Sequence, residues 1–254
     1  MSTRPRTPRS DTPPAAKPAG KAAAKSAAQP TLAKLAKPAK SAARPKLSIK
    51  TRPVQQRSHD TYEQILAATA QLLGQVGIER LSTNLICQRL GVSPPALYHY
   101  FPNKYAIVHE LGSRLMQAQD AVVAAWATTQ TLALPAPRLQ QGLAAMLGEM
   151  FHETAQRPEG VWVLRALRAV PALQAVRIQS HERVAQMFVD AFTKAYPKVD
   201  LAGARLTARV AVDMGSAAMD LLFDAPQFEP AAVAETLASM ITSQVVALRR
   251  AGAG

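Results

Sequence analysis

Apolar residues recur at intervals of three and four along most of the chain, and this spacing restricts the fold more than any other feature. Such spacing places side chains on one face of an α-helix, whereas a half-buried β-strand needs strict alternation. We find no alternating strand pattern and no internal repeat. Prolines interrupt the helical period, which covers 104–128, 136–156, 161–169, 172–195, 201–223 and 230–250. The pattern predicts an all-α chain in which a short N-terminal helical cluster precedes a longer helical bundle.

The basic charge is concentrated at the N-terminus. Residues 1–57 contain 14 Lys and Arg and one acid, Asp11, which leaves +13, the formal charge of the whole chain. The same segment holds nine prolines and few large apolar side chains, so it cannot bury enough surface to offset its ordering entropy. We expect a disordered tail over residues 1–57. Its composition resembles linker-histone tails, which bind phosphates loosely, and a solubilising linker is the alternative.

Cysteine use and hydropathy indicate a reduced compartment. Cys87 is the only cysteine, so an intramolecular disulfide is excluded, and no Cys/His spacing resembles a zinc site. Cys87 is then either a buried apolar group or a redox-sensing thiol. We find neither a signal peptide nor an apolar stretch of about 20 residues, although an organelle transit peptide is an alternative for the basic N-terminus. We expect a cytoplasmic protein with no membrane partner, metal or cofactor.

The folded part begins with an amphipathic helix. Asp60 and Glu63 are typical of a helix start, and Gly77 ends the apolar period. The inward face is formed by Tyr62, Ile65, Leu66, Thr69, Leu73 and Val76.

Residues 81–104, LSTNLICQRLGVSPPALYHYFPNK, predict two short helices joined by a turn. We expect Ser82 to cap the first helix and Gly91 to end it in a left-handed conformation. Ser93 is placed to cap the second helix, and Pro94 and Pro95 fit its first two positions, where amide protons would be unpaired.

The second of these helices has two different faces. Leu97 and Phe101 are four residues apart and face inward. The outward face consists of Pro95, Ala96, Tyr98 and His99. Such a face fits the recognition helix of a helix-turn-helix, which contacts DNA in the major groove. A helix hairpin with a tyrosine-rich surface is the alternative.

In this region the chain resembles the TetR family of repressors. The resemblance covers residues 61–112 and rests on Gly77, Ser82-Thr83, Leu90-Gly91-Val92-Ser93, Leu97-Tyr98-His99-Tyr100-Phe101 and Asn103-Lys104. It implies a DNA-binding domain over residues 58–112. Phosphate contacts would come from Thr83, Tyr98, Tyr100 and Lys104, and the residues nearest the bases would be Asn84, Pro94, Pro95, Ala96 and His99, with Ser93 beside them.

For residues 113–254, the resemblance implies a helical regulatory domain with an internal pocket and a dimer interface on the last two helices. The expected interface stripes are Leu206, Val210, Met214 and Ala217, followed by Val233, Leu237, Ile241, Val245 and Leu248. Packing of both stripes inside a monomer is the alternative. The expected pocket residues are Trp126, Met146, Met150, Phe151, Trp162, Met187 and Phe188. Arg165 and Arg168 would either meet a ligand carboxylate or have an outward-facing or salt-bridged role.

These features favour a ligand-responsive repressor that binds a palindromic operator as a homodimer, responds to an unknown small-molecule effector and associates with the bacterial nucleoid. No H-E-x-x-H, G-x-S-x-G or phosphate-binding glycine loop occurs, so we expect no enzyme activity. Two alternatives stay open. One is an architectural protein that coats DNA through its tail, and the other is a helical carrier or enzyme.

Overall fold

The computed structural model describes residues 45–53, 55–157 and 159–251, and within these ranges it contains ten α-helices and no strand. The predicted all-α fold is confirmed. The N-terminal cluster comprises α1 (Gln56–Arg80), α2 (Thr83–Leu90) and α3 (Pro94–Tyr100). The following helices are α4 (Lys104–Trp126), α5 (Thr129–Ala133), α6 (Ala136–Ala155), α7 (Gly160–Ala169), α8 (Gln174–Ala195), α9 (Leu201–Asp224) and α10 (Pro230–Ala251).

Helix α1 starts earlier than the sequence predicts. It begins at Gln56 instead of Asp60, and Asp60 accepts a hydrogen bond of 3.0 Å from the Gln56 side chain within the first turn. The predicted break at Gly77 is confirmed, because this residue has φ 72° and ψ 169° and kinks the helix. Only glycine adopts such a conformation without strain.

The segment before α1 differs from the predicted tail. Leu47 and Ile49 pack against the N-terminal core. The amide of Lys50 donates to the carbonyl of Tyr100 at 2.9 Å, and Asn103 Nδ2 donates to the carbonyl of Lys46 at 2.9 Å. Disorder is therefore the wrong prediction for residues 45–53 and for 56–57, which belong to α1. Residues 1–44 and 54 of the predicted tail lie outside the described residues.

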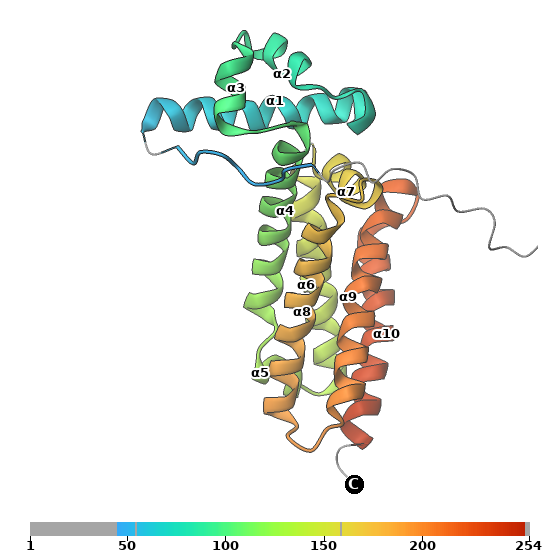
Figure 1. Ribbon diagram of the computed structural model, residues 1–254. Coiled ribbons are helices and arrows are strands. Elements are labelled where there is room, and N and C mark those ends of the chain that lie inside the picture. Colours follow the sequence, from blue (N-terminus) through green and yellow to red (C-terminus); the bar gives the residue numbers. More distant parts are fainter. Residues whose placement is uncertain (1–44, 54, 158, 252–254) are drawn as a thin grey trace, which may run out of the picture. The chain divides into compact units, whose positions relative to one another are not determined.

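The N-terminal cluster has a core that it shares with α4 and α7. Ile65, Leu97 and Phe101 are fully buried there, and the ring of Tyr62 stacks on Phe101 with centroids 4.9 Å apart. Figure 1 shows α1 lying across the end of the longer helices, where it packs against α4 and α7.

An ion pair joins α1 to α4. The guanidinium of Arg114 on α4 binds both carboxylate oxygens of Glu63 on α1, at 2.7 and 2.9 Å, and also contacts Glu110 at 3.0 Å. A two-pronged pair of this kind fixes orientation as well as distance. The hydrogen bonds of Arg114 hold the pKa of Glu63 below its usual value, so this carboxylate stays ionised at neutral pH.

The remaining helices form a bundle in which α4, α6, α8, α9 and α10 run side by side (Figure 1). Its core includes Val123, Leu139, Leu143, Phe192 and Ala238. Helix α10 is long and apolar enough to cross a membrane by length and composition, contrary to the sequence expectation. Its inner face, which contains Leu237 and Ala238, is buried in the bundle, where α10 packs against α6 and α9.

The crossing of α4 and α7 gives a test of the fold. A Cβ atom added to Gly112 would lie 2.7 Å from Cδ2 of the fully buried Leu167. Leu167→Ala should lower the free energy of unfolding by about 2–5 kcal/mol. Gly112→Ala alone should gain helix propensity but clash with Leu167. In the double variant the added methyl fills vacated space, so the double loss should be smaller than the sum of the single losses by about 1 kcal/mol. Urea unfolding of all four proteins measures the coupling, and strict additivity would contradict this packing.

Candidate nucleic-acid interface

Helix α2 is capped at both ends as the sequence predicts. The Ser82 hydroxyl accepts a hydrogen bond of 3.2 Å from the amide of Leu85. Gly91 is left-handed, with φ 67° and ψ 24°. Cys87 lies on the inner face and is buried, and burial raises the pKa of its thiol. A thiol that stays protonated is a poor nucleophile. This favours the interpretation of Cys87 as a buried apolar group over that of a redox-sensing thiol.

Helix α3 starts at Pro94 and Pro95 as predicted, but the predicted side-chain cap by Ser93 is wrong. The Ser93 side chain makes no capping hydrogen bond. Its carbonyl accepts the first backbone hydrogen bonds of the helix, from the amides of Ala96 at 3.0 Å and Leu97 at 3.3 Å. The two prolines have no amide proton, so fewer donors at this end of the helix need a side-chain partner.

The outer face of α3 is open to solvent. Leu97 and Phe101 are fully buried below it, whereas Tyr98 is 39% exposed. Thr83 Oγ1 and Tyr98 Oη are hydrogen-bonded at 2.9 Å, which joins the start of α2 to α3. Most of the predicted contact residues share this surface: Asn84, Ser93, Pro94, Pro95, Tyr98 and His99 are exposed, and Thr83 and Ala96 are half-buried.

Tyr100 and Lys104 point elsewhere. Tyr100 is 6% exposed, and its ring meets Tyr62 edge to face at 5.9 Å. The ammonium group of Lys104 donates to the carbonyls of Ile78 at 2.8 Å, Leu81 at 2.9 Å and Glu79 at 3.3 Å. An ammonium group has three protons, so all are engaged by the chain that follows the kink at Gly77. This geometry does not favour the phosphate contacts that the family resemblance implies for these two residues.

The bundle encloses a cavity between α4, α6, α8, α9 and α10. Its empty space is about 790 Å³, part of which is open to solvent. Three predicted pocket residues, Met146, Met150 and Phe188, line it. Small side chains of α9 form much of one wall: Ala204, Ala208, Ala211 and Gly215.

The other four predicted pocket residues do not line this cavity. Trp126 packs edge to face on Phe188, with centroids 6.3 Å apart. Phe151 stacks on Phe223, and Trp162 is 37% exposed beneath the guanidinium of Arg165. Met187 lines a separate surface groove with Asp120 and Arg183.

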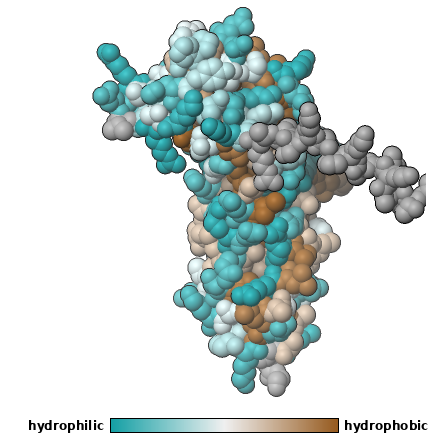
Figure 2. Space-filling model, viewed as in Figure 1, coloured by the Kyte–Doolittle hydropathy of each residue, from teal (hydrophilic) through white to brown (hydrophobic). Residues whose placement is uncertain are grey.

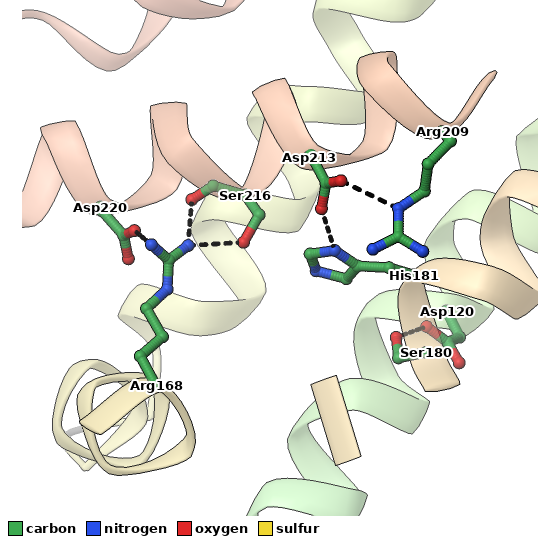
Figure 3. Close-up of polar contacts among 8 residues, drawn as sticks. All are labelled: Asp120, Arg168, Ser180, His181, Arg209, Asp213, Ser216 and Asp220. Carbon is green, nitrogen blue, oxygen red and sulfur yellow. Dashed lines mark hydrogen bonds and ion pairs between the residues drawn. The ribbon is translucent and has the colours of Figure 1, made fainter. Parts of the chain in front are cut away.

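Polar contacts tie α9 to its neighbours (Figure 3). Arg168 on α7 forms an ion pair with Asp220 and a 2.8 Å hydrogen bond to the Ser216 hydroxyl. Arg165 pairs with Asp224 at 2.6 Å. Both arginines therefore form salt bridges, a role among the alternatives predicted from the sequence. Neither arginine lines the cavity.

His181 on α8 completes the contacts with α9. Its Nδ1 lies 2.6 Å from Asp213 Oδ1, and Arg209 Nε donates to the other oxygen of Asp213 at 2.9 Å. Burial lowers the pKa of His181 and outweighs the opposite effect of Asp213, while Arg177 and Arg209 add to the lowering. The imidazole is therefore neutral at pH 7. No cluster of His, Cys, Asp and Glu suited to a metal ion occurs among the described residues.

Residues 65–111 match the family model described as "Bacterial regulatory proteins, tetR family". The class C tetracycline repressor protein of Escherichia coli is 39% identical over 54 residues, which are 21% of this chain and 25% of that protein. The HTH-type transcriptional regulator BetI of Vibrio atlanticus (strain LGP32) is 31% identical over 88 residues, or 35% and 42% of the two chains. The chain thus spans less than half the length of these curated relatives.

Solved structures resemble this chain over a longer stretch. A tetR-family transcriptional regulator from Streptomyces coelicolor covers 76% of this chain and 88% of its own length, with a TM-score of 0.54 and 18% identity. The fatty acid degradation regulator FadR from Bacillus halodurans covers 76% and 97%, with a TM-score of 0.56 and 16% identity. At such identities the likeness establishes the fold alone.

The contacts of Lys104 predict a structural role that can be measured. Lys104→Met keeps the apolar stem but leaves three carbonyls without their charged donor, so the free energy of unfolding should fall by about 1–3 kcal/mol. Lys194→Met removes an exposed lysine of α8 and is the control, with an expected change within about 0.5 kcal/mol. Equal urea midpoints for Lys104→Met and wild type would show that these hydrogen bonds contribute nothing.

Proposed function

We propose that this chain, a member of the TetR family of bacterial regulators through its domain at residues 65–111, is a ligand-responsive repressor in the bacterial cytoplasm. In this proposal it binds a palindromic operator as a homodimer. The observation that carries the proposal is the exposed outer face of α3, which stands on the fully buried Leu97 and Phe101.

The geometry of α3 suits reading of DNA. A recognition helix contacts base edges with its N-terminal residues while neighbouring groups bind phosphates. Pro94 and Pro95 lie at the exposed N-terminal end of α3, and His99 is exposed one turn further along. The hydroxyls of Thr83 and Tyr98 lie together at the edge of this face and are suited to a phosphate oxygen.

An uncovered apolar stripe on α9 supports dimerisation. Leu206 is 67% exposed, Val210 47% and Leu221 42%, and Met214 and Ala217 fall on the same helical face. Figure 2 shows hydrophobic residues exposed on the part of the bundle formed by α9 and α10. A two-fold axis would bury this stripe against its own copy, as an isologous interface requires.

The contribution of α10 to the proposed interface differs from the sequence expectation. Ile241, Val245 and Leu248 line the cavity, and Leu237 is buried, so this stripe faces the bundle interior. For the stripe on α10, the alternative prediction of packing inside the monomer therefore fits better than a dimer interface. Met240, which is 54% exposed, lies on the outer side of α10 and is available to the interface.

The cavity is suited to a small, neutral and largely apolar effector. Its lining includes no charged side chain, and Thr207 is the single side-chain hydroxyl among the described lining residues. A ligand with a net charge would lose hydration there without gaining a partner.

A route from the cavity to DNA runs along α4. Val123 on α4 lines the cavity, and Arg114 on the same helix holds Glu63 of α1. A ligand that changes the position of α4 would therefore bias the position of the DNA-binding helices, provided that it binds one arrangement more tightly than the other.

The recognition face is tested with a duplex selected by the wild-type protein. Tyr98→Ala should weaken binding by about 1–2 kcal/mol through a lost phosphate contact, and His99→Ala should change the preferred sequence. His152→Ala, an exposed histidine on α6, is the control and should bind as wild type does. If Tyr98→Ala and His99→Ala both kept wild-type affinity and sequence preference, α3 would not be the recognition helix.

The interface is tested by Leu206→Arg, which places a charge where the proposed dimer excludes water. Because this side chain is 67% exposed, the monomer should still fold and show wild-type helical content. Sedimentation should give a monomer for Leu206→Arg and a dimer for wild type and for Ile178→Arg, the control on α8. A dimeric Leu206→Arg protein would exclude this face as the interface.

A further inference from the structure

The segment of residues 46–52, which we term the N-terminal arm, has two different sides. Leu47, Ile49 and Thr51 are half-buried, whereas Lys46, Ser48, Lys50 and Arg52 are exposed. Alternation of this kind is produced by an extended backbone, in which successive side chains point in opposite directions. The arm therefore has an inner apolar side and an outer basic side.

The inner side of the arm is anchored at the corner between α3 and α4. Leu47 and Ile49 pack against the core of the N-terminal cluster. Three hydrogen bonds add to this packing. Asn103 Nδ2 donates to the carbonyl of Lys46 at 2.9 Å, the Lys50 amide donates to the carbonyl of Tyr100 at 2.9 Å, and Lys50 Nζ donates to the carbonyl of Tyr98 at 3.1 Å.

The anchoring holds two basic residues, Lys46 and Lys50, at the corner between α3 and α4. The ammonium group of Lys104, at the start of α4, is fully engaged by backbone carbonyls. Lys50 uses one of its three ammonium protons on Tyr98 and keeps two for another acceptor. Lys46 is exposed, and its backbone carbonyl is bonded to Asn103.

We propose that the N-terminal arm is part of the DNA interface, and that Lys46 and Lys50 neutralise backbone phosphates beside the bases read by α3. This inference rests on the proposed function of α3. It adds a surface outside residues 65–111, the extent of the family match. Double-stranded DNA fits better than an acidic protein, because Lys50 is bonded to α3 itself, close to the exposed Tyr98 and His99.

The test compares three full-length proteins on the duplex selected by wild type, by fluorescence anisotropy between 50 and 200 mM KCl. The first is wild type and the second carries Lys46→Ala and Lys50→Ala. The third is a matched control, Lys194→Ala with Lys198→Ala, which removes two exposed lysines near the α8–α9 turn.

Each phosphate that is neutralised adds about 0.9 to the slope of log affinity against log salt. The arm variant should therefore lose up to about 1.8 from the slope, so over this fourfold change in salt its affinity should fall up to about 12-fold less than that of wild type. The control should keep the wild-type slope. The ratio of selected to random-sequence affinity should stay constant, because phosphates carry no sequence information.

A further variant separates an anchored arm from a free basic tail. Ile49→Ser keeps every cation but weakens the apolar anchor, so the slope should fall toward that of the arm variant. An Ile49→Ser slope equal to wild type would overturn the anchored arm. Circular dichroism should give wild-type helical content for the Lys46→Ala with Lys50→Ala variant and for Ile49→Ser, since the arm lies outside the helices.

The other outcomes distinguish failure of the arm from failure of the proposed function. If wild type binds the selected duplex and the arm variant keeps its slope, the arm is not part of the interface and the proposed function is unaffected. If the remote control loses as much slope as the arm variant, general charge accounts for the effect and the inference fails. If wild type enriches and binds no DNA, the proposed function fails, and the inference, which rests on it, fails with it.

Discussion

The fold depends on α4 belonging to two hydrophobic cores at once. Ala106, Ile107 and Val108 near its start are fully buried in the N-terminal core, and Val123 near its end is buried in the bundle core. Between them, Arg114 holds both oxygens of Glu63 on α1. Because packed interiors do not deform continuously, a shift of α4 at the bundle end must be transmitted to α1 or break these contacts. This constraint makes a cavity beside Val123 relevant to the surface of α3.

Local rules predicted the helix-turn-helix well, and tertiary contacts account for the differences. The start and end of each helix depend on residues a few positions apart, so a local sequence pattern is enough to predict them. This applies to Ser82, Gly91, Pro94 and Pro95. Lys104 instead caps carbonyls 23 to 26 residues earlier, and no local pattern indicates that. The arm was missed because its short alternation is embedded in a segment dominated by Lys, Ala and Pro. Periodicity found the stripe on α10 but could not say which neighbour it faces.

The cavity shows a different limit of sequence reasoning. Large side chains were selected as pocket residues, and three of the seven line the cavity. Much of the α9 wall consists of Ala204, Ala208, Ala211 and Gly215, because space remains where side chains are small. Small residues also occur throughout well-packed helices, so they carry no sequence signal for a pocket until the facing helices are known. Trp126 and Phe151, by contrast, fill space against Phe188 and Phe223.

Selection of duplexes from a random pool by the full-length protein tests most directly whether α3 of a homodimer reads DNA sequence. A pair of α3 helices related by a two-fold axis predicts enrichment of a short inverted repeat, with half-sites separated by about one helical turn or a multiple of it, roughly 34–36 Å. Recovery of duplexes without a common motif, at affinities that vary with salt but not with sequence, would contradict this account. It would indicate that charge, and not the exposed face of α3, governs DNA binding.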